Sequence, residues 1–199
     1  MSKRIEARTL AFTGIERGSG ATCLSVAMAN YLAAYEGEKT AHICMSGRAE
    51  TEALREFEKD KYFTVYGVTY LPLSDPGELP EAFYFVNVKK YDRVIIDLGT
   101  LCEKNLSEFK RSDRGYLVGG MMPWQIETVR HRVENFMLSE YNSVGFPIIR
   151  NFRFLAFGGS VNERVFKDTN IRLPVIRVPY IEDPLDIKKE QRAFFNKLI

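Results

Sequence analysis

Residues 8–32 read RTLAFTGIERGSGATCLSVAMANYL, and this stretch decides the fold. It opens with an apolar run at residues 10–12 that is typical of a buried strand. A glycine-rich segment follows over residues 14–20. Apolar side chains then recur at spacings of three and four, which predicts a helix over residues 21–36 that stops before Gly37. These apolar residues are Leu24, Ala27, Met28, Tyr31 and Leu32.

A glycine-rich turn between a strand and a helix is well suited to binding an anion. Backbone N–H groups point into the concavity of such a turn, and the helix dipole favours negative charge. Glycines let the backbone approach a phosphate without an intervening side chain. The alternative is a turn needed for folding alone, in which Thr22 caps the helix. The candidate phosphate- or nucleotide-binding residues are Glu16, Arg17, Gly18, Ser19, Gly20, Ala21, Thr22 and Cys23.

Strand-like and helix-like segments alternate along the whole chain. The predicted strands cover residues 8–13, 40–45, 62–73, 92–98, 116–119, 152–157 and 174–178. The predicted helices cover residues 21–36, 50–59, 80–89, 103–110, 123–138 and 183–199. This alternation favours an α/β three-layer sandwich with a mostly parallel central sheet.

Composition narrows the class of protein. The chain has 199 residues, 45% hydrophobic and 27% charged, which fits a single domain over residues 1–199. A net charge of +2 gives no reason to expect sequence-specific nucleic-acid binding. The sequence contains no run of roughly 18 apolar residues and no signal-peptide core, so we expect a cytoplasmic protein. The cysteines and histidines lack zinc-site spacing and are expected to pack or lie at the surface; they are Cys23, Cys44, Cys102, His42 and His131.

Five segments resemble the MinD/ParA group of ATPases. Residues 15–22, IERGSGAT, are similar to that family's deviant Walker A loop, xKGGxGK[ST], and match it at Gly18, Gly20 and Thr22. Residues 91–97, YDRVIID, resemble the strand that carries the Walker B acid, here Asp97. Three further segments are similar to later parts of the family pattern, at residues 27–33, 122–124 and 178–180. The resemblance implies a bacterial protein with a P-loop NTPase-like fold, ATP or ADP with Mg²⁺ as ligand, a homodimer and protein partners.

The departures from this pattern concern the phosphate-binding cations. The family has a lysine where Ala21 stands and a second, signature lysine where Glu16 stands. Such ammonium groups neutralise charge as a phosphoryl group is transferred. Loss of one such donor costs on the order of 10² in rate or more. Arg17 is the one cation of the loop, and we assign no catalytic residue.

Two other family residues are replaced. The strand ending near Met45 leads in the family to an aspartate, whereas here no acid occurs until Glu50. The strand ending near Phe157 usually supplies an asparagine for adenine, which residues 156–159, AFGG, lack. Thr22 and Asp97 persist and are the candidate magnesium ligands. Alternatively, Asp97 is a structural carboxylate that bonds to nearby N–H groups or to Thr22.

The C-terminal helix and Trp124 each allow two interpretations. The helix has an apolar face and basic charge; the residues are Phe194, Phe195, Leu198 and Ile199, with Lys188, Lys189, Arg192 and Lys197. Some family members end in a membrane-binding helix, so the resemblance admits a peripheral membrane contact. Docking of the apolar face on the sheet is favoured. For Trp124, packing on the sheet at a helix start is favoured over a contact surface.

Two functions are consistent with these patterns. The first is a degenerate MinD/ParA-like pseudo-ATPase, a binding, regulatory or localisation factor that keeps nucleotide or phosphate binding without hydrolysis. Relatives of the TadZ/CpaE type have atypical Walker loops, but they also carry a receiver-like domain for which this chain has no room. The second is an active ATPase whose site is completed by dimerisation, with Arg17 or a partner's arginine supplying charge.

Overall fold

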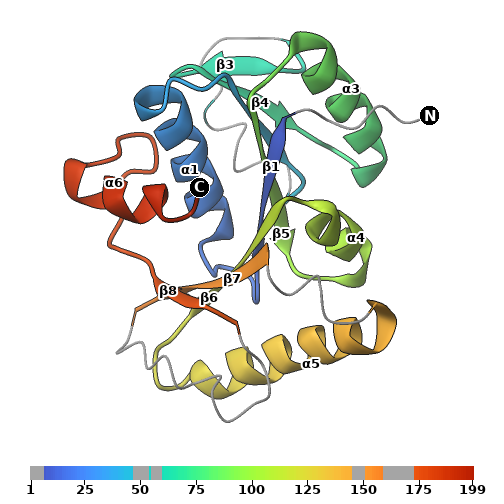
Figure 1. Ribbon diagram of the computed structural model, residues 1–199, viewed down its shortest axis with the longest axis vertical. Helices are drawn as coiled ribbons and strands as arrows, with labels where there is room; N and C mark the ends of the chain where they lie inside the picture. Colours follow the sequence, from blue (N-terminus) through green and yellow to red (C-terminus); the bar gives the residue numbers. More distant parts are fainter. Residues whose placement is uncertain (1–6, 47–53, 55–59, 145–150, 159–172) are drawn as a thin grey trace.

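The computed structural model describes residues 7–46, 54, 60–144, 151–158 and 173–199. Within them, eight strands form one sheet in the order β3-β4-β2-β5-β1-β6-β7-β8 (Figure 1). All neighbouring strands run parallel except β3 and β4, so the predicted mostly parallel sheet is confirmed. The strands are β1 Arg8–Gly14, β2 Thr40–Cys44, β3 Phe63–Val65, β4 Val68–Pro72, β5 Arg93–Thr100, β6 Arg114–Gly120, β7 Phe152–Phe157 and β8 Val175–Arg177.

The apolar strand β1 lies in the middle of the sheet, between β5 and β6. Its residues from Thr9 to Gly14 are all buried, as expected of a parallel strand covered on both faces. Phe12 stands opposite Asp97 of β5 and Tyr116 of β6. Because parallel strands end at the same edge, the segments that follow β1 and β5 lie together at the carboxyl edge of the sheet.

Helices cover both faces of the sheet, which confirms the three-layer arrangement (Figure 1). On one face, α1 Ala21–Tyr35 and α6 Lys189–Asn196 share a hydrophobic core with the sheet. On the other face lie α3 Leu79–Lys89, α4 Glu103–Arg111 and α5 Ile126–Val144, after the short 3₁₀ turn η1 Pro76–Glu78.

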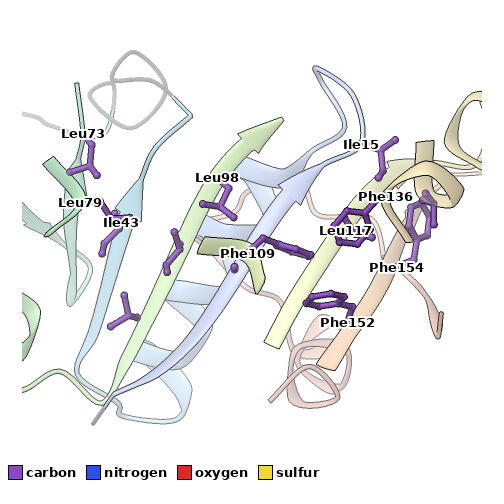
Figure 2. Packing of buried hydrophobic residues seen from close by; sticks show 14 of the residues in the cluster. Ile15, Ile43, Leu73, Leu79, Leu98, Phe109, Leu117, Phe136, Phe152 and Phe154 are labelled. Atoms are coloured by element: carbon purple, nitrogen blue, oxygen red, sulfur yellow. The ribbon is translucent and has the colours of Figure 1, made fainter. Parts of the chain in front are cut away.

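Aromatic rings tie α4 and α5 to the sheet (Figure 2). Phe109 of α4 stacks on Phe152 of β7 with ring centroids 4.7 Å apart, and Phe136 of α5 lies 5.8 Å from each ring. Gly115 of β6 makes this possible, since a Cβ there would lie 2.6 Å from the Phe109 ring. Such ring pairs stabilise the core beyond the area that they bury.

The segment predicted as one strand over residues 62–73 is a hairpin instead. Tyr66 and Gly67 join β3 to β4, and both have positive φ, 49° and 81°. Positive φ at both central positions of a two-residue turn reverses the chain with the twist that a hairpin needs. The prediction of a single strand was wrong because tyrosine rarely adopts this conformation.

Two predicted helices begin later than expected. The helix predicted over residues 123–138 begins at Ile126, because Pro123 lies in a turn closed by a bond from the Gln125 N–H to the Met122 carbonyl, 2.8 Å. The helix predicted over residues 183–199 is limited to α6, where the Gln191 side chain accepts from the Lys188 N–H at 2.8 Å and starts the helix. The predicted helix over residues 50–59 lies outside the described residues, apart from residue 54.

The favoured interpretation of the C-terminal helix is confirmed. Phe194, Phe195 and Leu198 are buried, and the Phe195 ring stacks on Tyr31 of α1 with centroids 5.4 Å apart. The apolar face of α6 is therefore covered by α1 and the sheet (Figure 1). Among the helices described, none combines the length and apolarity that crossing a membrane requires.

Candidate functional site

The glycine-rich loop after β1 is held firmly at its base. The Ile15 N–H donates to the Val118 carbonyl at 2.8 Å, and the Gly14 carbonyl accepts from the Leu101 N–H at 2.9 Å. Gly18 and Gly20 have φ of 76° and 89°, a left-handed conformation that glycine adopts without strain. The loop therefore turns sharply after β1 and leads directly into α1.

The first turn of α1 presents free backbone donors. Its first intrahelical bond runs from the Leu24 N–H to the Gly20 carbonyl, 3.0 Å, so the N–H groups of Ala21, Thr22 and Cys23 have no helical acceptor. No side chain caps this helix, and its first turn holds no acid. The interpretation of Thr22 as a helix cap is therefore wrong. Uncapped N–H groups at a helix start are suited to an anion.

The two charged side chains of the loop, Glu16 and Arg17, differ in their surroundings. Glu16 is half-buried, and its carboxylate accepts from the Gln125 amide at 3.1 Å. Arg17 is exposed and forms no hydrogen bond or ion pair with the described residues. Ala21 is buried and contributes a methyl group. From the other side, Arg132 of α5 donates to the Ile15 carbonyl at 2.6 Å.

Asp97, in the carboxyl-terminal half of β5, is fully buried and accepts several hydrogen bonds. One carboxylate oxygen accepts from the Gly99 N–H at 3.0 Å, and the other accepts from the Ser46 hydroxyl at 2.9 Å. The Thr22 hydroxyl and the Cys44 thiol also bond to this carboxylate. The hydrogen bonds expected of Asp97, to a nearby N–H group and to Thr22, are both present.

Burial raises the pKa of the Asp97 carboxyl, although the bonds from Gly99, Thr22, Ser46 and Cys44 oppose the shift. A magnesium ion would have to displace some of these donors and would need the ionised carboxylate. In the part of the chain that the structure describes, no three acidic, histidine or cysteine side chains come together as a metal site. Thr22 and Asp97 are the side chains here that could hold Mg²⁺ together with the phosphates of a ligand.

Two buried polar side chains, Ser25 and His42, lie next to the first turn of α1. The Ser25 hydroxyl donates to the Thr22 carbonyl at 2.9 Å and lies 2.9 Å from Nε2 of His42 in β2. Nδ1 of His42 is buried without a hydrogen-bond partner. Burial lowers the pKa of His42 to about 3, so the ring is neutral at ordinary pH. Cys23 beside this turn is half-buried, and burial with the nearby Asp183 carboxylate raises the pKa of its thiol.

The end of β5 after Asp97 is fixed to α4 by the buried Asn105. Its amide nitrogen donates to the carbonyls of Leu98 and Thr100, each at 2.8 Å. Its oxygen accepts from the Cys102 N–H at 3.0 Å. One side chain thus holds two backbone groups at the end of β5 and one in the link to α4.

Phe157 occupies the end of β7, where the sequence lacks the asparagine expected for adenine. Its ring lies against the loop, since a Cβ on Gly20 would be 2.7 Å from Cε2 of the ring. The neighbouring Gly158 lies close to the Met122 thioether, whose sulfur would be 3.1 Å from a Cβ there. Hydrophobic side chains therefore line this side of the loop.

The interpretation of Trp124 as an aromatic packed on the sheet is wrong. The side chain is 74% exposed, because the chain turns at Pro123 and the helix starts only at Ile126. Tyr180, after β8, is also exposed. Both follow strands of the same parallel half of the sheet, so both lie toward its carboxyl edge.

Comparisons with known proteins fall into two groups. No family model and no curated protein matches this chain. Solved structures match at low sequence identity but over nearly the whole chain. A ParA family ATPase from Chlorobium tepidum matches with a TM-score of 0.61 at 15% identity, covering 96% of this chain and 91% of that one.

Two further structures agree. A plasmid partition protein from Borrelia burgdorferi bound to AMPPNP matches with a TM-score of 0.64 at 14% identity, covering 97% of this chain and 96% of that one. The MinC:MinD cell division protein complex of Aquifex aeolicus matches with a TM-score of 0.59 at 13% identity, covering 96% and 86%. The chain has the fold of the ParA and MinD ATPases. The predicted P-loop NTPase-like class is thereby confirmed.

Within this ParA/MinD fold, the predicted loop residues are contiguous, and Thr22 meets Asp97 as expected. Sequence reasoning missed Ser46, Gln125, Arg132 and Phe157, which contact Asp97 or the loop. Ser46 could have been found, because it follows a strand that neighbours β5 and so ends at the same edge. The other three depend on tertiary packing.

Proposed function

We propose that this chain is a degenerate ParA/MinD-like protein that binds a phosphate-bearing ligand at residues 16–23 and does not hydrolyse it. The uncapped first turn of α1 carries the proposal, because the N–H groups of Ala21, Thr22 and Cys23 form an anion site that needs no lysine. The similar partition protein with AMPPNP makes a nucleoside polyphosphate the first ligand to test.

Hydrolysis is not expected, because the loop lacks the charge that phosphoryl transfer needs. Ala21 supplies a methyl group, and Glu16 supplies a negative charge bonded to Gln125. Loss of each preorganised donor costs on the order of 10²–10³ in rate. The hydrogen bonds that already occupy the Asp97 carboxylate also argue for a ligand that binds with little dependence on Mg²⁺.

Calorimetric titration with pyrophosphate, ADP and ATP, with and without Mg²⁺, tests binding, and a phosphate-release assay tests turnover. We expect binding that changes little with Mg²⁺, and no turnover above buffer. Failure of all three ligands to bind would refute the anion site. Turnover at the rate of intact ParA or MinD proteins would refute the loss of hydrolysis.

Restoration variants give a sharper test of the missing charge. An ammonium group about 4 Å from a phosphate oxygen contributes up to about 4 kcal/mol at an effective dielectric of 20. After desolvation, Ala21→Lys should tighten pyrophosphate binding at least about tenfold. Ala21→Met, of similar length but uncharged, should not. Glu16→Gln keeps an acceptor for Gln125 and should tighten binding by removing repulsion alone.

The active-ATPase alternative rests on Arg17, which is exposed and has no partner among the described residues. In a homodimer, this arginine would be free to reach the ligand of the other copy. Turnover that rises with protein concentration and is lost in Arg17→Ala would establish it. Unchanged turnover in that variant would exclude this role.

The biological role that we propose is a binding, regulatory or localisation factor that acts through protein contacts, with residues 1–199 as one domain. The exposed Trp124 and Tyr180 at the carboxyl edge support a contact surface near the loop. The MinC:MinD complex shows a protein of similar fold with a protein partner. Co-purification with wild type, but not with Trp124→Ser, would test this contact.

A further inference from the structure

A cavity of about 350 Å³ opens beside the phosphate loop, on the face of the sheet opposite α1. Its apolar lining comes from the loop residue Ile15, from Leu101 and Leu106, and from Phe136 of α5. Figure 2 shows Ile15 and Phe136 on this face. The volume lies at the lower end of the range for small-molecule sites.

The polar lining defines the ligand chemistry. Arg132 uses one N–H on the Ile15 carbonyl and has no ion-pair partner in the described part of the chain, so its remaining N–H groups are available to a carboxylate. Glu103 also lines the cavity and would repel a ligand with several negative charges, such as a phosphate ester. A ligand with a single carboxylate on an apolar body can pair with Arg132 and carries too little negative charge to be strongly repelled by Glu103.

Two residues of the cavity lining, Ile15 and Leu101, belong to the segments that flank residues 16–23, and the other walls come mainly from α4 and α5. Ile15 immediately precedes Glu16, and the Leu101 N–H bonds to the Gly14 carbonyl at 2.9 Å. A ligand that contacts Ile15, Leu101 and Arg132 would therefore stabilise one arrangement of the phosphate loop. Any such coupling works equally in both directions.

We infer that this cavity binds a small organic carboxylate with an apolar body, and that its occupancy alters phosphate binding at residues 16–23. The first half stands on the cavity alone, and the second half rests on the proposed function.

Cys102, an exposed free thiol in the cavity lining, reports occupancy without any phosphate ligand. The alkylation rate of each cysteine by iodoacetamide is followed by peptide mass spectrometry, with phenylacetate as the probe and uncharged phenylacetamide as its match. At about twice the Kd, mass action slows Cys102 about threefold. Cys23 should be unaffected, and the amide should bind about tenfold more weakly because it loses the charge-assisted bond.

Two variants make the outcome decisive. Arg132 is exposed, and Arg132→Gln should remove the preference for phenylacetate over its amide. Leu106→Trp should remove the protection of Cys102 by filling the cavity, and circular dichroism checks that this variant folds natively. No protection of Cys102, or equal protection by acid and amide in wild type, overturns the carboxylate site.

The coupling is read separately, as the change in the Kd of pyrophosphate when phenylacetate is saturating. A shift of at least about threefold is expected, and an unchanged Kd overturns the coupling while leaving the carboxylate site intact. If pyrophosphate does not bind at all, the proposed function fails, and Cys102 protection still decides the cavity.

Discussion

Acidification should destabilise this protein mainly through one buried ring, that of His42. The side chain is fully buried beneath α1, where Nε2 meets the Ser25 hydroxyl at 2.9 Å and Nδ1 has no partner. A second proton would be buried on a nitrogen with no acceptor, which the fold resists. The unfolded chain takes up that proton readily, so falling pH favours unfolding.

The size of the effect comes from the pKa. Burial lowers the pKa of His42 from 6.5 to about 3. At about 1.4 kcal/mol per pH unit, the stabilisation present above pH 6.5 amounts to on the order of 5 kcal/mol and is lost as the pH falls toward 3. At pH 5, roughly 2 kcal/mol should already be gone. Typical domains have about 5–15 kcal/mol in total, so the loss is large.

Urea unfolding at several pH values between 4 and 7 measures this loss, with His42→Gln as the matched variant because glutamine can bond to Ser25 but does not titrate. The unfolding free energy of wild type should fall more steeply below pH 6.5 than that of the variant. The NMR signal of the His42 ring should not titrate until near pH 4. Parallel curves for the two proteins would refute the reasoning.

Three further perturbations have defined outcomes. Gly20→Ala should cost roughly 1–2 kcal/mol of unfolding free energy, because φ is 89° and a Cβ would lie 2.7 Å from the Phe157 ring. In a double-mutant cycle, Phe157→Ala should recover the steric part of this cost. Strictly additive losses of unfolding free energy in the double mutant would contradict the contact. Asp97→Asn should gain stability relative to wild type as the pH rises above about 4, because the raised pKa of Asp97 means that wild type loses stability as the carboxyl ionises. Urea titrations showing the opposite trend would reject burial as the cause. Phe195→Ala should cost about 3–5 kcal/mol in the same assay, and a loss below about 1 kcal/mol would show that α6 is not docked.

Local pattern was enough to predict the layers of this fold and the position of the loop. The apolar run of β1, the glycines and the spacing of α1 all lie within one short stretch, and each has its own physical signature. Errors arose where a single residue departs from its usual behaviour. Tyr66 takes positive φ and turns a strand into a hairpin, while Asp183 bonds to the Leu185 N–H at 2.8 Å in a turn that delays α6.

Within the candidate site, the residues that belong to a known sequence pattern were predictable, whereas contacts that depend on packing between distant elements were not. Thr22 and Asp97 could be paired because the family pattern links a loop to a strand end. Gln125 and Phe157 could not, because their contacts with Glu16 and Gly20 depend on how α5 and β7 pack. A side chain's role at an edge of a parallel sheet is set by neighbours that are distant in sequence.

The three hydrogen bonds made by the Asn105 side chain have a mechanical consequence. Because its amide grips the backbone at Leu98, Thr100 and Cys102, the segment beyond Asp97 cannot flex while α4 stays still. Any movement of that segment would therefore be passed to α4, whose far end at Arg111 lies roughly 12 Å along the helix from Glu103, at about 1.5 Å per residue. Cutting that linkage with Asn105→Ala would leave the loop free to move alone.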